Sequence, residues 1–294
     1  MFCRLTLPIF SGILYFSALL FSGPNTGNKN IGKVNCSDPN RYEIVHKWKL
    51  PDELDEVSGI AWLEDDKIAC IQDEKGNIYI YNPATSQIEK EIKFAGHGDY
   101  EGISVKGNTA YVVRSDGRVY EVTNFLKKTP EVHIIESGLT RKQNIESICV
   151  EAGRRLLLGT KYEEENTDQY KGIYAYNLTK KHLIKDPVIK IKMRDKIFEA
   201  FEDKDPEKVM SPSDIAIHPD SGEIYIVDGR RPKLLILSPS GMPEKLIELD
   251  KDDFAQPEGI CFSPSGNLYI SNEASGGTAN ILEVKILENI SRQQ

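Results

Sequence analysis

The feature that most constrains the fold is a motif that occurs five times, an acidic residue followed by a short apolar segment. The five stretches read DEVSGIAW, GHGDYEGISV, NIESICV, SPSDIAIHP and QPEGICFSP. Their acids are spaced by 45, 45, 68 and 44 residues and are Glu56, Glu101, Glu146, Asp214 and Glu258. Self-similarity at such a period is typical of architectures built from repeats.

Each repeat contains segments that are typical of β-strands, separated by turn residues. In the first repeat they are residues 57–63, 67–73, 77–82 and 88–94, rich in β-branched and aromatic residues, with Gly, Asn and Asp between them. Four strands about every 45 residues predict the blades of a β-propeller. The third repeat is longer because it holds a stretched hairpin at 162–172 and a polar, helix-like segment at 193–209. These two segments account for the excess without a further blade.

The two ends of the repeat region complement each other. The fifth repeat stops one strand short, after residues 279–287, whereas a strand-like segment at 41–50 precedes the first acid and belongs to no blade. Pairing these segments would close the ring and cover both open sheet edges. We therefore predict an all-β fold, a five-bladed β-propeller closed by an N-terminal strand that joins the last blade. Six blades is the alternative count.

The sequence divides into a leader, a linker and the propeller domain. Residues 1–23 carry Arg4, then the apolar run 5–21 and small residues, the layout of a signal peptide; an uncleaved membrane anchor is the alternative. Residues 24–40 are rich in Asn, Gly and Pro and read as a linker, and 41–294 form the propeller. This organisation predicts an exported protein, periplasmic or at the cell surface.

The net charge argues against one class of partner, nucleic acid, and the cysteine spacing argues against a zinc site. With 45 acidic and 37 basic residues the net charge is −8, which argues against nucleic acid, whose phosphates need a basic surface. Cys70, Cys149 and Cys261 lie in apolar strand segments at spacings that match no zinc motif, so they are expected to be buried, reduced thiols. Trp48 and Trp62 read as packing residues of strands.

The acids are expected to meet at one mouth of the central channel, because the first strand of each propeller blade lines that channel. The second strands end at the same face, and the polar residues there are predicted to bind a ligand: Asp73, Arg114, Lys161, Asp228, Arg230 and Glu273. Crowded carboxylates must protonate or bind a cation. Ca²⁺ prefers oxygen ligands, so the five acids are its predicted ligands. The alternative is that each acid accepts backbone N–H bonds and fixes a turn.

The ordered motifs EVSGIAW, YEGISV, NIESICV, SPSDIAIHP and PEGICFSPSGNLYISNE resemble those of the SdiA-regulated family, the YjiK-like bacterial propellers, over residues 42–290. The resemblance implies a five-bladed propeller with a calcium site, distantly akin to NHL-repeat propellers. The matching acids are the same five. The fourth motif departs from the pattern, with SD in place of EG, which gives Asp214 a shorter reach and leaves room for a different role.

Two classes of function follow from an acidic mouth. The first is a calcium-binding module that holds a small polar ligand or a loop of a partner protein. The second is a calcium-dependent hydrolase of the lactonase or phosphodiesterase type, as in paraoxonase-like proteins, in which the ion polarises the substrate. A hydrolase needs a general base, and His97, four residues before Glu101, is the candidate. The sequence contains neither a GxSxG nor an HExxH motif.

Overall fold

The computed structural model describes residues 42–151, 154–162, 170–201 and 208–287 of the chain. All of them belong to one compact unit, Pro39–Gln294. The predicted signal peptide at 1–23 and the linker at 24–40 lie outside the described residues. None of the described helices is long and apolar enough to cross a membrane.

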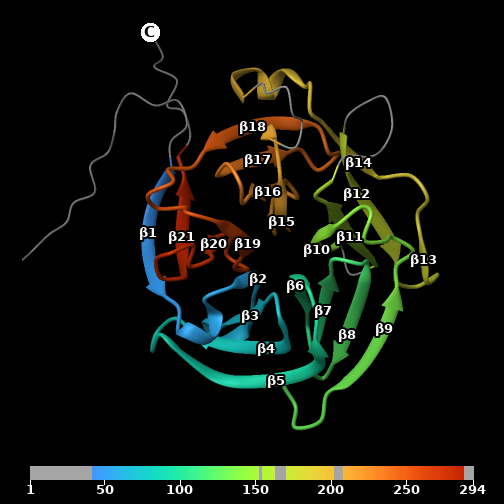
Figure 1. Cartoon of the computed structure of the whole chain (residues 1–294), viewed down its shortest axis with the longest axis vertical. Helices are drawn as coiled ribbons and strands as arrows, with labels where there is room; N and C mark the ends of the chain where they lie inside the picture. Colours follow the sequence, from blue (N-terminus) through green and yellow to red (C-terminus); the bar gives the residue numbers. More distant parts are fainter. Residues whose placement is uncertain (1–41, 152–153, 163–169, 202–207, 288–294) are drawn as a thin grey trace, which may run out of the picture. The chain divides into compact units, whose positions relative to one another are not determined.

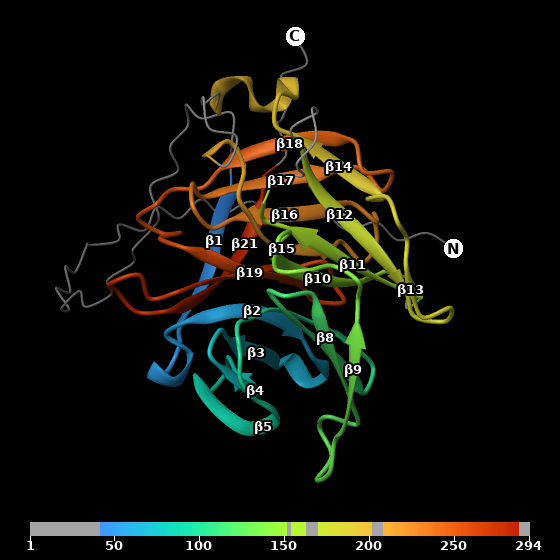
Figure 2. The same ribbon diagram turned by 45° about the vertical axis from the view of Figure 1, so that its right-hand side comes forward.

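Five antiparallel sheets surround a common centre (Figures 1 and 2), which confirms the five-bladed β-propeller. The first two blades are built from β2 (Val57–Trp62), β3 (Ile68–Gln72), β4 (Lys75–Asn82) and β5 (Gln87–His97), then β6 (Tyr100–Lys106), β7 (Thr109–Arg114), β8 (Arg118–Thr123) and β9 (Glu131–Glu136). The fourth and fifth are built from β15 (Pro212–Ile217), β16 (Ile224–Asp228), β17 (Lys233–Leu237) and β18 (Pro243–Glu248), then β19 (Pro257–Phe262), β20 (Leu268–Asn272) and β21 (Asn280–Ile286).

The N-terminal strand closes the ring as predicted. Strand β1 (Tyr42–Lys49) pairs antiparallel with β21, from Tyr42 opposite Ile286 to Lys49 opposite Asn280. In Figure 1 the blue β1 lies beside the red β21. The fifth blade therefore has the order β1-β21-β20-β19 and joins the two ends of the described chain.

The third blade departs from the four-strand pattern at its outer edge. Its inner strands are β10 (Ile145–Glu151), β11 (Arg155–Thr160) and β12 (Tyr170–Asn177). The outer strand is split into β13 (His182–Leu183) and β14 (Ile189–Lys192), which pair with opposite ends of β12. The helix-like segment contains the short 3₁₀ helix η3 (Lys196–Phe201), which buries Phe198. The extra residues of the third repeat thus lengthen one blade and add no other.

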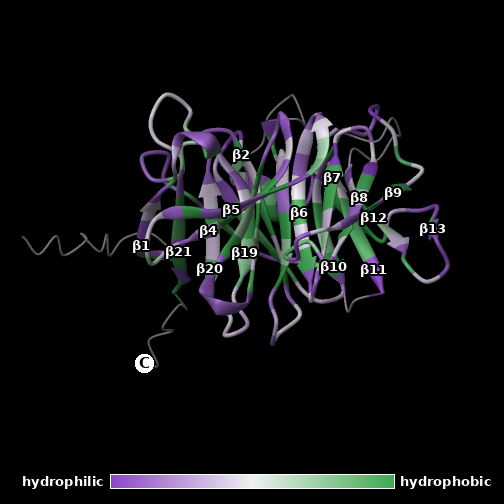
Figure 3. Ribbon diagram, turned by 90° about the horizontal axis from the view of Figure 1, so that it is seen from below, coloured by the Kyte–Doolittle hydropathy of each residue, from purple (hydrophilic) through white to green (hydrophobic). Residues whose placement is uncertain are grey.

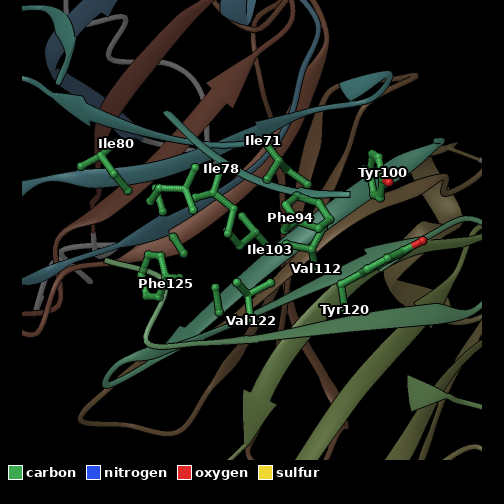
Figure 4. Close-up of a cluster of buried hydrophobic side chains, with 14 of the residues drawn as sticks. Ile71, Ile78, Ile80, Phe94, Tyr100, Ile103, Val112, Tyr120, Val122 and Phe125 are labelled. Atoms are coloured by element: carbon green, nitrogen blue, oxygen red, sulfur yellow. The ribbon is translucent and has the colours of Figure 1, made fainter. Parts of the chain in front are cut away.

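The hydrophobic core is divided among the blade-to-blade interfaces. Figure 4 shows one such cluster, in which Ile71, Ile78 and Phe94 of the first blade pack against Ile103 and Val112 of the second. Aromatic rings add edge contacts there, with the centroids of Phe94 and Tyr100 5.1 Å apart. Figure 3 shows hydrophobic residues along the strands and hydrophilic residues in many of the loops at the two ends.

The three cysteines of the strands are free and buried, as the sequence predicts. The two tryptophans are half-buried: Trp48 on β1 and Trp62 on β2 both pack against Tyr269 of the fifth blade. Two further 3₁₀ turns, η1 (Asp52–Leu54) and η2 (Glu64–Asp66), flank β2.

Candidate functional site

A β-bulge occurs near the start of every inner strand, where one extra residue interrupts the pairing with the second strand. The register shifts fall at the same place in all five blades. Bulges of this kind re-aim side chains and are common beside functional sites. The residues at the bulge are Ser58, Glu101, Glu146, Ser213 and Glu258.

The bulges give a structural alignment of the repeats that differs from the expected equivalence of the five acids. Glu101, Glu146 and Glu258 occupy the bulge, whereas serines occupy it in the first and fourth blades. Glu56 lies two residues before the bulge of its blade, and Asp214 lies one residue after. A shift of one residue turns a strand side chain to the opposite side, which separates Asp214 from the bulge glutamates. Glu56 precedes the first residue of β2, so the five acids do not occupy equivalent positions.

Asp214 lies one position further along its strand than the bulge. The residues at this position in the five blades are Gly59, Gly102, Ser147, Asp214 and Gly259. The side chain of Asp214 is fully buried, and its Oδ2 accepts the N–H of Ile260, in the next blade, at 2.9 Å. Its Oδ1 accepts its own strand's Ile215 N–H at 2.8 Å. Burial raises its pKa well above the usual value, while these backbone bonds oppose the shift. Asp214 thus accepts backbone N–H groups, as the alternative reading of the acids expects, but its donors lie in the strands β15 and β19 and not in a turn.

The three bulge glutamates converge on one lysine, and we call these four residues the glutamate ring: Glu101, Glu146, Glu258 and Lys161. Lys161 Nζ lies 2.8 Å from Glu146 Oε2. The glutamate side chain is 5% exposed and the lysine side chain 32%. The ring therefore contains its own cation, held against a buried carboxylate.

Neutral residues position these carboxylates. Asn144, two residues before the bulge of its blade, donates a hydrogen bond to Glu146 Oε1. Gln256, at the same place in the fifth blade, donates to Glu258 Oε1 at 3.2 Å. A Cβ added at Gly229 would lie 2.7 Å from Glu258 Oε1, so the absence of a side chain there leaves the room that this carboxylate occupies.

The electrostatics of the glutamate ring favour uptake of positive charge. Burial, reinforced by Glu146 and Asp99, raises the pKa of Glu101 to about 10. Burial likewise raises the pKa of Glu258 to about 8, although Lys161 opposes the shift. The pKa of Glu146 is also raised by burial, again against Lys161. Burial lowers the pKa of Lys161, but the surrounding carboxylates outweigh it and hold that pKa above its usual value. One ammonium group does not balance three carboxylates in this setting.

A second group of acids, which we call the acidic edge, lies where the first and fifth blades meet: Glu56, Asp73 and Glu273. Burial, then Glu56, Glu74 and Glu273, raises the pKa of Asp73 to about 6. The pKa of Glu273 is raised by burial and by Glu56. Asp73 Oδ1 is buried and has no hydrogen-bond partner among the described residues. This carboxylate oxygen is therefore buried beside two further carboxylates without a hydrogen-bond donor among the described residues.

Common backbone bonds place Asp73, Lys161 and Glu273 at equivalent positions, just after the second strand of their blades. The N–H of Lys161 donates to Asn144 O and that of Glu273 to Gln256 O, both at 2.9 Å. Asp73 N–H donates to Glu56 O in the same way at 3.4 Å. The glutamate ring and the acidic edge therefore open on the same face of the propeller.

The remaining predicted ligand-binding residues are engaged in the hairpins of their own blades. Arg114 is paired with Asp116. Asp228 forms a fully buried ion pair with Lys233, at 2.6 Å, and accepts the N–H of Arg230 at 2.9 Å. The side chain of Arg230 is exposed.

The candidate base His97 lies at the end of β5, the outermost strand of the first blade. It is exposed, and its backbone pairs with Lys75. In the part of the chain that the structure describes, no interaction connects it to the glutamate ring. The loop that leads from β5 to β6 brings Glu101 to the channel but leaves His97 outside it.

The sequence reading missed the bulge serines and the neutral residues that hold the ring, Asn144 and Gln256. A signal for the correct alignment is present in the sequence. An isoleucine stands two residues after each bulge, and these residues are Ile60, Ile103, Ile148, Ile215 and Ile260. Alignment on the isoleucines gives the register of the blades, which alignment on the acids does not.

The donor chemistry of the mouth suits Ca²⁺, since all of the candidate ligands are carboxylate oxygens. The orphaned Asp73 Oδ1 fits such an ion at the acidic edge, where it would be held by Glu56, Asp73 and Glu273. In the glutamate ring, by contrast, Lys161 competes for the same oxygens. Among the described residues no three His, Cys, Asp or Glu side chains stand close enough together to hold a metal without movement.

No protein-family model matches the sequence, and no curated protein matches it. The resemblance to the SdiA-regulated family therefore stays a prediction. Among solved structures, the fold is similar to glutaminyl cyclase from Myxococcus xanthus, with a TM-score of 0.60 and 12% identity over 84% of this chain and 97% of that one. It is also similar to the PQQ-bound form of aldose sugar dehydrogenase from Streptomyces coelicolor, with a TM-score of 0.51 and 12% identity over 84% and 98% of the two chains. At such identities the likeness shows the β-propeller fold alone.

Proposed function

We propose that this protein is a binding module whose acidic mouth takes up a cation, with Ca²⁺ as the ion. The observation that carries the proposal is the charge imbalance at the mouth. The glutamate ring and the acidic edge together present six carboxylates, and Lys161 is the cation paired with them among the described residues. Buried carboxylates in such excess gain stability when a cation joins them.

The acidic edge is the better place for the ion. Asp73 and Glu273 have raised pKa values that a divalent cation would lower, and Asp73 Oδ1 is without a partner in the described part of the chain. Bound there, Ca²⁺ would neutralise the acids and draw the two loops together. Glu101, Glu146 and Glu258 would then face a polar ligand or a partner loop that carries an ammonium or guanidinium group.

Export is part of the proposal, because Ca²⁺ is more available outside the cytoplasm. Residues 1–23 have the composition of a signal peptide, and the proposed location is the periplasm or the cell surface. The net charge of −8 supports a cationic rather than a nucleic-acid partner. Membership of the SdiA-regulated family, proposed from the motifs, agrees with a calcium site.

The test is thermal unfolding of metal-stripped protein with added Ca²⁺ or Mg²⁺, repeated for Asp73→Asn. At a hundredfold excess over its dissociation constant, Ca²⁺ should stabilise the wild type by about 2.7 kcal/mol. The substitution should abolish most of this gain. Glu136→Gln is the matched control, since Glu136 is an exposed acid on the outer strand β9 with 72% side-chain exposure. No shift of the melting temperature and no calorimetric heat with millimolar Ca²⁺ would refute the calcium site.

The calcium-dependent hydrolase, of lactonase or phosphodiesterase type, is the weaker proposal. A general base must lie within a hydrogen bond or one water of the reacting group. His97 is exposed at the end of the outermost strand of its blade. If the calcium-loaded protein turns over a lactone or phosphodiester, and His97→Asn abolishes that turnover, the hydrolase becomes the better proposal.

A further inference from the structure

The end of the channel opposite the acidic mouth holds a cavity of about 240 Å³. The C-terminal halves of the five inner strands line it, together with the turns that follow β15 and β19. Trp62, Val105, Ile217 and Phe262 are among the lining side chains, and each is half-buried.

The lining differs from the mouth in carrying no formal charge. None of the lining residues is Asp, Glu, Lys, Arg or His. Burial raises the pKa of the Cys149 thiol to about 12, so it stays neutral, and the pKa of Cys261 is raised in the same way. The hydroxyl of Ser104 already accepts the N–H of Val150 at 3.0 Å. Such walls penalise a charged ligand, which would lose its hydration without a partner.

Aromatic rings at the rim are held in place by other rings. Trp62 lies over Tyr269 of the fifth blade, with centroids 4.6 Å apart. Phe262 makes edge contacts with Tyr225 and His218, both at 4.9 Å between centroids. Trp62 and Phe262 are half-buried, border the cavity and are packed against other rings, which restrains their positions. A restrained aromatic lining lowers the entropic cost of binding an apolar guest.

The size of the cavity sets the size of the guest. An enclosed apolar cavity of about 150 Å³ in another protein binds benzene. The present cavity of about 240 Å³ is open on one side and has polar as well as apolar walls, so a molecule such as a bicyclic aromatic would fit with part of its surface in contact with water. We propose that this end of the propeller binds a small, uncharged aromatic molecule. The inference is independent of the cation site, since it uses none of the residues of the mouth.

The fluorescence of Trp62 can report binding in the cavity, because Trp62 lines it and Trp48 is the only other tryptophan. Trp48→Phe leaves Trp62 as the sole tryptophan, which is excited selectively at the long-wavelength edge where tyrosine does not absorb. The probe is N-phenyl-1-naphthylamine, an uncharged aromatic dye that brightens in apolar surroundings and accepts energy from tryptophan. We expect saturable binding of one dye molecule, with quenching of Trp62 and enhanced dye emission.

Two variants in the Trp48→Phe background localise the dye. Val105→Lys places a charge in the cavity lining and should weaken binding at least about tenfold. The matched control is Val132→Lys on the outer strand of the same blade, where Val132 is 37% exposed, and it should leave the affinity unchanged. Phe262→Leu keeps an apolar side chain but removes one aromatic face, and should weaken binding several-fold.

The proposal is overturned by the absence of saturable dye binding to the folded Trp48→Phe protein. It is also overturned if Val105→Lys keeps both the parent melting curve and the parent affinity. If Val105→Lys does not fold, Phe262→Leu decides: an unchanged affinity refutes the site, and a weakened affinity with an unchanged melting curve supports it.

Discussion

At the scale of the residue, Asp214 and Glu258 show how one position along an inner strand changes the role of a carboxylate. Glu258 occupies a bulge, and its Oε1 fills the space over Gly229 at the mouth. Asp214 stands one place further along its own strand and accepts the N–H of Ile260. The first carboxylate is available to a cation, and the second is committed to the backbone of the adjacent blade.

The raised pKa values of Glu101 and Glu258 predict a stability that falls as pH rises. An unperturbed glutamate titrates near 4.5, whereas these two titrate at about 10 and about 8 in the folded protein. The folded state therefore binds more protons than the unfolded state between about pH 4.5 and about pH 10. Their favourable contribution is complete below the unfolded pKa and is lost as pH rises through the folded values.

We expect the free energy of unfolding in urea, measured without metal, to decrease by several kcal/mol across this window, since each unit of pKa shift corresponds to about 1.4 kcal/mol. Glu101→Gln and Glu258→Gln together should make the profile shallower, because an amide cannot ionise. Asp73, Glu146 and Glu273, whose pKa values are also raised, would retain part of the slope. A metal-free profile that rises with pH over the same range, or one that the two substitutions leave unchanged, would contradict this account of the mouth.

Lys161 is the other residue whose loss is predicted to matter. Lys161→Met leaves the buried carboxylate of Glu146 without its cation, and we expect a loss of about 2 kcal/mol at neutral pH, moderated because the lysine is partly exposed. The control is Lys47→Met, whose partner Asp253 lies 4.0 Å away with both side chains nearly half exposed. The Lys47–Asp253 pair should contribute close to zero to the free energy of unfolding. Equal effects of the two substitutions in urea unfolding would show that Lys161 does not stabilise the buried carboxylate of Glu146.

At the scale of the element, serine hydroxyls connect neighbouring inner strands where the bulge carries no acid. Ser213 Oγ on β15 donates to Pro257 O on β19, and Ser58 Oγ on β2 donates to Tyr100 O on β6, both at 2.7 Å. These bonds hold the starts of adjacent inner strands together in the blades that lack a glutamate at the bulge.

Ser213→Ala should therefore destabilise the protein by about 1–2 kcal/mol, since it removes a buried hydrogen bond between two inner strands. Ser240→Ala, in an exposed hairpin where the hydroxyl contacts Ser238, is the control and should change stability by less than about 0.5 kcal/mol. Differential scanning calorimetry of the two variants compares them directly. A Ser213→Ala protein as stable as the control would mean that other contacts hold these strands.

The strands were predictable from the sequence, because alternating apolar residues and turn signals are local properties. The closure of the ring was predictable for a different reason. The segment 41–50 without a blade of its own was enough to predict the β1–β21 pairing. The register of the bulges was not predicted. A bulge inserts one residue whose position depends on the pairing with the second strand, and the acids of the first and fourth repeats fell on either side of it. The role of Lys161 was missed in part, because its partner Glu146 lies on another strand.

At the scale of the whole molecule, ring closure depends on β1. The strand is half exposed along its length, yet it covers the edge of β21, and Tyr42 and Ile44 pack onto the interface between the fourth and fifth blades. A chain that begins at residue 51 should therefore be less stable than one that begins at residue 42 by several kcal/mol, and more prone to associate through the open edge. Urea unfolding and size-exclusion chromatography of the two chains measure both effects. Identical unfolding midpoints would show that the ring closes with only three strands in the fifth blade.

The pairing of Tyr42 with Ile286 has a mechanical consequence. The domain's first and last strands run antiparallel with these two residues side by side, so a load applied between them pulls at one end of the ladder. Hydrogen-bonded pairs would then break one after another, like a zipper, instead of resisting together in shear. A propeller tethered at both ends would open at low force, beginning at this seam, with the other four blades still folded.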